Sequence, residues 1–222
     1  MRQNYSVLLL LLFGLIPGGA MADTGLTIEL PAPKVTSSAS LEHVIAQRRS
    51  QRQFTNSSLT IGEVGQLLWS AQGITDPKGL RAAPSAGALY PLEIYVVAGT
   101  IEDMAPGIYH YRPDRHQLIK TESGDSRMAL ARAALSQDWI ADAAAVVVFT
   151  ADYRRTMRKY AHRSKRYVHI ETGHAAENLF LQAQSLGLAT VIVGAFDDDA
   201  LASVLRLPAE LQPLLLMPVG RD

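Results

Sequence analysis

The stretch "APSAGALYPLEIYVVAG" (residues 83–99) decides the fold, because it joins a run of small residues to an apolar run rich in β-branched side chains. The chain turns at Tyr90-Pro91, and the apolar run predicts a strand over 94–97. Small side chains let the backbone approach a flat or bulky partner closely. The ordinary alternative is a tight turn entering a strand, which explains the whole run of small residues less well.

On either side of this stretch, apolar spacing predicts interleaved helices and strands. Helices are expected over 41–49, 60–72, 126–135, 167–186 and 197–205, with Ser40 and Thr60 as caps of the first two. Further strands are expected over 107–111, 117–121, 143–150, 189–193 and 214–219. Because helices dominate, the sequence predicts an α+β fold with a mixed central sheet covered by helices and a long buried helix over 167–186.

The first 22 residues have the features of a secretory signal peptide. Arg2 precedes an apolar segment over 7–16, Pro-Gly-Gly breaks it, and Ala-Met-Ala over 20–22 is a small-x-small cleavage site. We therefore expect cleavage after Ala22, a periplasmic or secreted mature chain, and no membrane span in it. The alternative is an uncleaved N-terminal anchor, although the apolar segment is short for a span. An irregular arm over 23–40 and one domain over 41–222 would follow.

Composition excludes several function classes. The 222-residue chain has no cysteine, which excludes disulfides, thiolate metal sites and cysteine nucleophiles. Without Arg2 the mature chain would carry 20 Lys and Arg against 21 Asp and Glu, so no general charge favours nucleic acid. There is no dinucleotide or P-loop fingerprint. Glu171 and His174 form one E-x-x-H spacing, whereas a di-iron bundle needs two, so no metal site is predicted.

Three further segments carry candidate ligand-binding residues. "RRSQRQF" over 48–54 places guanidinium groups and a hydroxyl where a phosphate monoester would fit, although a solvated basic helix end explains it as well. "VGAFDD" over 193–198 ends a predicted strand before a helix, which is equally an ordinary junction. "PVGRD" at the terminus carries an arginine that could be a plain surface charge. A hydrolase using Ser85 is a weaker alternative, since no GxSxG elbow surrounds that residue.

In this order, the segments resemble the nitroreductase-fold family of FMN flavoproteins, and most of all its SagB/ThcOx-type dehydrogenase branch. That branch includes azoline dehydrogenases that act on ribosomal peptides. The resemblance covers about residues 41–221 and is carried by "RRSQRQF", "RAAPSAGALYPLEIYVV", "GIYHYRPDRHQL", "RKYAHRSKRYVHIETGHAAENLFLQAQSLGLA" and "VGAFDDD…LLLMPVGRD".

The resemblance implies an FMN-dependent oxidoreductase that works as a homodimer by two-step flavin hydride transfer. A small molecule or a peptide would be the substrate, and the electron donor is open, with NAD(P)H as one candidate. The alternative is a periplasmic protein of the same fold that binds flavin or a partner without turnover.

The motif match also implies which residues bind the FMN phosphate. Arg48, Ser50 and Arg52 would hold it, and Arg221 would join them from the chain end. Arg49 would present its backbone to the flavin or to the ribityl chain.

For the flavin ring, the match implies two segments poor in side chains. Ser85, Ala86 and Gly87 would pack against the ring across a subunit boundary. Gly194 and Ala195 would approach its opposite edge. Hydrogen bonds and charge near the ring nitrogens would set its potential.

Azoline dehydrogenases also have a Lys-Tyr pair assigned to proton handling, which the match places at Lys159 and Tyr160. The alternative is a solvated pair within a stretch that carries seven Lys and Arg over 153–167. Many nitroreductases have Asn near the position of Ala88, so its absence speaks against ordinary nitroaromatic reduction. The sequence ends at Asp222 without a C-terminal arm, so dimerisation is expected to use the long helix and the N-terminal region.

Overall fold

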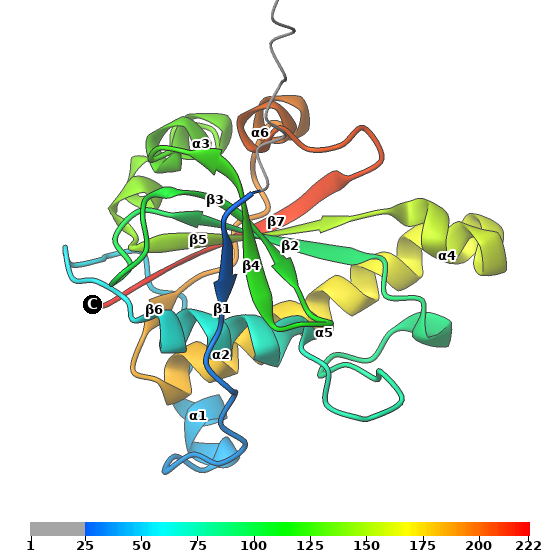
Figure 1. Cartoon of the computed structure of the whole chain (residues 1–222), viewed down its shortest axis with the longest axis horizontal. Coiled ribbons are helices and arrows are strands. Elements are labelled where there is room, and N and C mark those ends of the chain that lie inside the picture. Colours follow the sequence, from blue (N-terminus) through cyan, green and yellow to red (C-terminus); the bar gives the residue numbers. More distant parts are fainter. Residues whose placement is uncertain (1–24) are drawn as a thin grey trace, which may run out of the picture.

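The computed structural model describes residues 25–222, so the predicted signal peptide over 1–22 lies outside the described residues. Seven strands form one central sheet in the order β1-β4-β3-β2-β5-β7-β6 (Figure 1). They are β1 (Thr27–Glu29), β2 (Leu92–Ala98), β3 (Gly107–Arg112), β4 (Gln117–Ser123), β5 (Ala145–Ala151), β6 (Ala189–Thr190) and β7 (Gln212–Gly220).

Every pair of neighbouring strands in the sheet is antiparallel, so the expectation of mixed strand directions was wrong in this detail. The cause is the connectivity: β2, β3 and β4 follow one another through short loops, and a short loop can join only antiparallel neighbours. β5 is an interior strand with all seven residues buried, as its continuous apolar run predicts.

Residues 25–222 form six α-helices, which are α1 (Leu41–Gln47), α2 (Ile61–Gln72), α3 (Arg127–Ala133), α4 (Tyr153–Tyr160), α5 (Ser164–Ser185) and α6 (Asp198–Leu205). Four of the six cover the two faces of the sheet, while α1 and α4 pack against α5 (Figure 1). Figure 1 shows α2 and α5 on one side of the sheet and α3 and α6 on the other. Alternate residues of β2 enter the two cores: Ile94 packs with the α2 and α5 side, and Tyr95 with the α3 and α6 side.

The long helix α5 is confirmed and begins three residues earlier than predicted, but it is buried on one side only and leaves Ile170 48% exposed. Its 22 residues bury Val168, Ala175 and Leu179 against the sheet layer. The predicted caps are also present. The Ser40 side chain accepts the His43 N–H at the start of α1, and Thr60 and Glu63 form a reciprocal capping box on α2.

Two elements differ from the sequence prediction. β1 lies within the arm predicted to be irregular, where Thr27–Glu29 pairs with β4. α4 was not predicted, because its sequence is mostly charged and only Thr156 is buried. Three short 3₁₀ helices also occur, over Ala86–Ala88, Asp138–Asp142 and Ala161–Arg163. Between residues 25 and 222, no helix has the length and apolarity needed to cross a bilayer.

Candidate active site

The structure places the residues predicted for one site in two groups. We call residues 48–54 the arginine segment and residues 83–90 the small-residue loop. The arginine segment lies beside the C-terminus, and the small-residue loop lies beside the end of α4. Figure 1 shows these two places at opposite ends of the molecule.

Backbone hydrogen bonds hold the arginine segment against the edge of the sheet. The Gln51 N–H donates to the Thr190 carbonyl in β6 at 3.0 Å. Just beyond the segment, the Thr55 N–H donates to the Arg221 carbonyl at 2.8 Å. The segment therefore follows the last residues of the chain closely, as the motif match implied for residues at the start and finish of the domain.

Aromatic rings support two guanidinium groups of this segment. Arg48 lies over the ring of Phe180 in α5, with 4.7 Å from Cζ to the ring centroid. Arg52 lies over the ring of Trp139, with 5.9 Å from Cζ to the centroid. A guanidinium stacked on a ring keeps its N–H groups free in the plane of the fork, where a phosphate can accept them.

The three arginines of the segment are available to an anion. Within residues 25–222, no carboxylate lies within 4 Å of the guanidinium nitrogens of Arg48, Arg49 or Arg52. The Arg49 guanidinium donates instead to the carbonyls of Ala46 and Arg48, at 3.1 and 2.7 Å. A cavity of about 360 Å³ is lined by Ser50, Gln51, Arg52, Gln53 and Asp222.

Arg221 lies beside this segment, but its guanidinium is already paired. It donates to both carboxylate oxygens of Glu63, at 2.9 and 3.2 Å. The same Glu63 closes the capping box at the start of α2. If Arg221 contributes to the phosphate site as predicted, it does so while paired with Glu63. The spacing of the motifs did not indicate this ion pair.

Gly194 and Ala195 belong to the same end of the molecule. The Ala195 carbonyl accepts from Gln137 Nε2 at 3.0 Å, and Gln137 stands two residues before the Trp139 that supports Arg52. A Cβ built on Gly194 meets nothing within 4 Å. This strand end therefore presents exposed backbone beside the arginine segment.

The small-residue loop is held in a constrained turn. Gly87, Ala88 and Tyr90 all have positive φ, at +64°, +54° and +44°. Only Gly adopts this region without a steric cost. The Ser85 hydroxyl bridges the turn, because it donates to Glu171 Oε2 at 2.5 Å and accepts the Tyr90 N–H at 2.9 Å.

Lys159 and Tyr160 lie directly against this loop. A Cβ built on Gly87 would stand 3.0 Å from Lys159 Nζ and 2.8 Å from Tyr160 Oη. The Tyr160 ring packs edge-on against Tyr167, with 4.8 Å between centroids. The structure thus brings together the loop and the Lys-Tyr pair, which are more than 70 residues apart in sequence.

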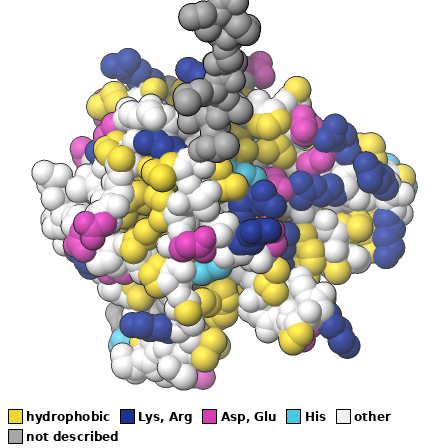
Figure 2. All heavy atoms as spheres, viewed as in Figure 1, with side chains coloured by type: hydrophobic (Ala, Val, Ile, Leu, Met, Phe, Trp, Pro, Cys, Tyr) yellow, Lys and Arg dark blue, Asp and Glu magenta, His cyan; other side chains and the backbone are white. Residues whose placement is uncertain are grey.

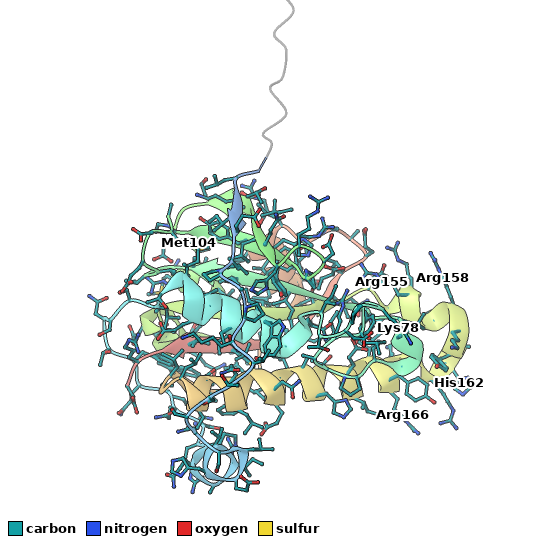
Figure 3. All side chains as sticks on the ribbon, turned by 60° about the horizontal axis from the view of Figure 1, so that its bottom comes forward. Lys78, Met104, Arg155, Arg158, His162 and Arg166 are labelled. Atoms are coloured by element: carbon teal, nitrogen blue, oxygen red, sulfur yellow. The ribbon has the colours of Figure 1, made fainter. Side chains whose placement is uncertain are left out.

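Basic side chains surround the Lys-Tyr pair. Figure 3 shows Arg155, Arg158, His162 and Arg166 at the end of the molecule where α4 joins α5. Figure 2 shows Lys and Arg side chains gathered over this end. Arg155 pairs with Glu93, and Arg154 with Asp152.

Glu171 is a residue of this site that sequence reasoning missed. It was considered only as half of an E-x-x-H metal spacing, yet its side chain is buried and bound to Ser85. Burial raises the pKa of its carboxyl to about 7, while Ser85, Arg81 and Gln72 act in the opposite direction. No signal in the sequence marks this contact, since the two residues are 86 positions apart.

The two groups contact opposite faces of α5. Ser85 binds Glu171, whereas Arg48 stacks on Phe180. These two α5 residues are about two and a half turns and roughly 13 Å apart, which places their side chains on opposite sides of the helix. Within one chain, the small-residue loop and the arginine segment therefore do not surround a common ligand.

Comparison with known proteins now identifies the family. Residues 45–221 match the model of the Nitroreductase family. The chain belongs to the nitroreductase family. Membership supports oxidoreductase chemistry, with a flavin as the cofactor at the level of the family.

Several proteins of known sequence or structure resemble this nitroreductase-family chain. The nitroreductase-like protein MJ1384 of Methanocaldococcus jannaschii is 45% identical over 197 residues, which cover 89% of this chain and 98% of that protein. A crystal structure of a nitroreductase homologue from Ralstonia eutropha JMP134 has a TM-score of 0.78 at 29% identity, covering 94% of this chain and 95% of that one. The microcin B17-processing protein McbC of Escherichia coli is 26% identical over 170 residues, covering 73% of this chain and 62% of McbC.

Proposed function

We propose that this protein is an FMN-dependent oxidoreductase in which two copies of the chain build each flavin site. The arginine segment of one subunit would hold the FMN phosphate, and the small-residue loop of the other would contact the ring. The observation that carries the proposal is the placement of these two groups on opposite faces of α5. A ligand that needs both groups must lie between two subunits.

The donor set of the arginine segment fits a phosphate. Arg48 and Arg52 are stacked on rings and lack a carboxylate partner among the described residues, and Ser50 lies in the adjoining cavity. Guanidinium forks bind phosphate oxygens in pairs, which gives direction as well as strength. Asp222 lines the same cavity, and its side-chain carboxylate accepts a hydrogen bond from Gln51 Nε2 at 2.7 Å, which partly offsets its negative charge.

The ring-binding residues fit a planar group. Open space lies over Gly194, and the turn at Ser85, Ala86 and Gly87 offers little side-chain bulk. When bound, FMN supplies an acceptor and donor of hydride. The residues of the chain supply the flat surfaces that orient the ring and exclude water from it.

Lys159 and Tyr160 would act on protons at the reacting atom of the substrate. Lys159 Nζ and Tyr160 Oη both reach the surface of the loop at Gly87, where the ring and the substrate would meet. Ammonium and phenol groups can each donate or accept a proton there. This pair, together with Ala88 in place of the usual Asn, favours a SagB-type dehydrogenase over a nitroaromatic reductase.

An unpartnered apolar surface supports a homodimer. α1 buries only Val44, and it leaves Leu41 61% and Ile45 55% exposed. Apolar side chains that project from one helix face are typical of surfaces that bind another subunit. A second copy covering α1 and α5 would bring the partner's small-residue loop toward the arginine segment.

The predicted signal peptide supports export, so the mature protein would work in the periplasm or outside the cell. NAD(P)H is scarce there, and the donor could be another small molecule or a protein. The substrate would be a small molecule or a peptide. A flavin-binding protein without turnover is the competing function, and it predicts a bound flavin that no physiological donor reduces.

The proposal is tested by the chromophore of the purified mature chain. The wild-type protein should be yellow, with FMN released on denaturation and identified by mass. Arg48→Ala with Arg52→Ala should lose the chromophore and keep the far-UV circular dichroism of the fold. The control, Arg115→Ala with Arg132→Ala, removes two exposed arginines elsewhere and should retain it. A wild-type protein that stays colourless after FMN addition would end the proposal.

A further inference from the structure

The buried carboxyl of Glu171 lies directly behind the small-residue loop, and the function proposed above does not use it. Its residue is only 2% exposed. Oε2 accepts the Ser85 hydroxyl, whereas Oε1 is buried and makes no hydrogen bond of ordinary geometry, although the Gln72 side chain lies close enough to lower the pKa of the carboxyl. A buried carboxyl that is only half satisfied costs stability, so its presence calls for an explanation.

A series of hydrogen bonds connects Glu171 to α2 through the loop. Ser85 Oγ accepts the Tyr90 N–H, and Tyr90 Oη accepts the Arg81 N–H at 3.1 Å. The Arg81 guanidinium stacks on the Tyr90 ring at 4.5 Å and donates to Gln72 Oε1 at 2.8 Å. The series ends at Gln72, whose buried Nε2 makes no hydrogen bond of ordinary geometry and whose side chain lies near the Glu171 carboxyl.

We propose that Glu171 is a positioning residue that, acting through Ser85, holds the small-residue loop in the conformation that receives the flavin. This inference rests on the proposed function. Ser85 is the link because its hydroxyl contacts both Glu171 and the backbone of Tyr90. It therefore fastens the start of the loop to its end and to α5.

The loop needs such a fastening because its backbone is strained. Ala88 and Tyr90 are not glycines, yet both have positive φ. Residues in this conformation persist only where surrounding contacts hold them. The Arg155 guanidinium donates to the Tyr90 carbonyl at 3.0 Å from the α4 side, so the Glu171–Ser85 contact is the matching restraint from the α5 side.

Flavin binding should be coupled to the protonation of Glu171. Arg81 is the charged group nearest in effect to the carboxyl, and Lys159 and Tyr160 lie beyond the loop. On α5 itself, Tyr167 and His174 stand about one turn before and one turn after Glu171. A ring that covers the loop would exclude bulk water from the loop surface, lower the dielectric around the buried carboxyl and so favour its neutral form. Affinity for FMN should then fall as pH rises through neutrality.

The experiment compares Glu171→Gln, Glu171→Ala and Ser85→Ala with Glu177→Gln, a matched control on an exposed glutamate of the same helix. Glu171→Gln keeps an acceptor for Ser85 and cannot ionise. Two quantities are measured: amide hydrogen exchange of residues 85–90 in the flavin-free protein, and the Kd for added FMN between about pH 6 and pH 8.

In flavin-free protein, Glu171→Ala and Ser85→Ala should speed exchange of the Tyr90 amide about tenfold or more, while both glutamine variants stay close to wild type. In FMN binding, Glu171→Ala should raise the Kd about tenfold, by roughly the loss of one buried hydrogen bond. The Kd ratio, which is the wild-type Kd divided by the Kd of Glu171→Gln at the same pH, removes the effect of the titration of FMN itself. This ratio should rise about threefold from pH 6 to pH 8.

Unchanged Tyr90 exchange in Glu171→Ala would overturn the inference, as would a Kd ratio that does not change with pH in proteins that bind FMN. The exchange measurement needs no flavin. If the wild type binds no FMN, the proposed function fails, and the exchange result still decides whether Glu171 holds the loop. If Glu171→Ala does not fold, Ser85→Ala removes the same contact from the exposed side.

Discussion

Gly87 combines two constraints that no other loop position shares. Its φ is +64°, and any Cβ would stand within 3.0 Å of both Lys159 Nζ and Tyr160 Oη. Those atoms are the far ends of flexible side chains, so they can move at little cost. Ala at this position should therefore displace the Lys-Tyr pair from the loop.

Gly87→Ala should cost about 1 kcal/mol of stability through backbone strain and should also move the Lys159 side chain away from the loop. The control is Gly79→Ala, since Gly79 has φ +84° and a Cβ there meets nothing within 4 Å. Both variants should lose similar stability in urea unfolding. Only Gly87→Ala should change the rate at which an amine-reactive reagent labels Lys159, as followed by mass spectrometry. Equal labelling in the two variants would show that the pair does not depend on Gly87.

The buried carboxyl of Glu171 predicts a pH dependence of folding. Its pKa rises from 4.5 to about 7 on folding, so the folded state binds more protons than the unfolded state between these values. The contribution of Glu171 to stability should therefore be greatest below about pH 4.5 and fall as pH rises toward 7, by about 3 kcal/mol, and then level off. Urea unfolding of Glu171→Gln should lack this component, while Glu177→Gln should keep it. A wild-type profile parallel to that of Glu171→Gln would contradict the buried, neutral carboxyl.

The order of residues in the sequence indicated some of the candidate site residues and left others unmarked. The small side chains at Ser85, Ala86 and Gly87 are visible in the sequence as a run, and so is the pair Lys159 and Tyr160. Only the resemblance to the family implied that the Lys-Tyr pair lies near these small residues, because their contact depends on where α4 packs in the fold. Neither the binding of FMN by these residues nor a proton role of the pair has been tested, and both stay predictions.

Among the helices, α2 depends most on its N-terminal cap. Thr60 and Glu63 satisfy each other's backbone groups, and the helix that follows buries eight residues. α1 is also capped, by Ser40, but buries only Val44. Fraying of α2 therefore disturbs the core, whereas fraying of α1 does not.

Thr60→Ala should lower the free energy of unfolding by about 1 kcal/mol or more, and Ser40→Ala by about half of that or less. Urea denaturation of the two variants at equal protein concentration measures the difference. Equal losses would mean that α1 contributes to the cooperative core as strongly as α2 does. The two variants can be compared directly, because each one removes the side-chain hydrogen-bond acceptor of one helix N-cap.

The elements that could be predicted are those with a repeating apolar pattern. The continuous apolar run of β5 and the apolar pattern of α5 were enough to predict these two elements, and the strands predicted over 107–111 and 117–121 correspond to β3 and β4. β1 was missed because three residues give no period, and its pairing with β4 spans about 90 positions. α4 was missed because a mostly exposed helix has no apolar stripe; its place is set by the loop before α5 and by Asp152, which caps it.

In the whole molecule, the two groups of site residues lie too far apart in one chain to face each other. Phe180 and Glu171 stand on opposite sides of α5, so the arginine segment and the small-residue loop serve different ligands unless a second copy is present. We propose the exposed apolar face of α1 as the surface that such a copy would cover. A two-fold dimer would then hold two equivalent sites, each made from both chains.

Mixed dimers test this arrangement most directly. Two variants carry different tags and are purified as heterodimers: one chain has Arg48→Ala with Arg52→Ala, and the other has Ala86→Trp, which fills the loop surface. Each variant as a homodimer should bind no FMN. The heterodimer has one site with both lesions and one with neither, so it should bind about one FMN per dimer. A heterodimer that binds none, while wild-type dimers bind two, would contradict a flavin site shared between subunits.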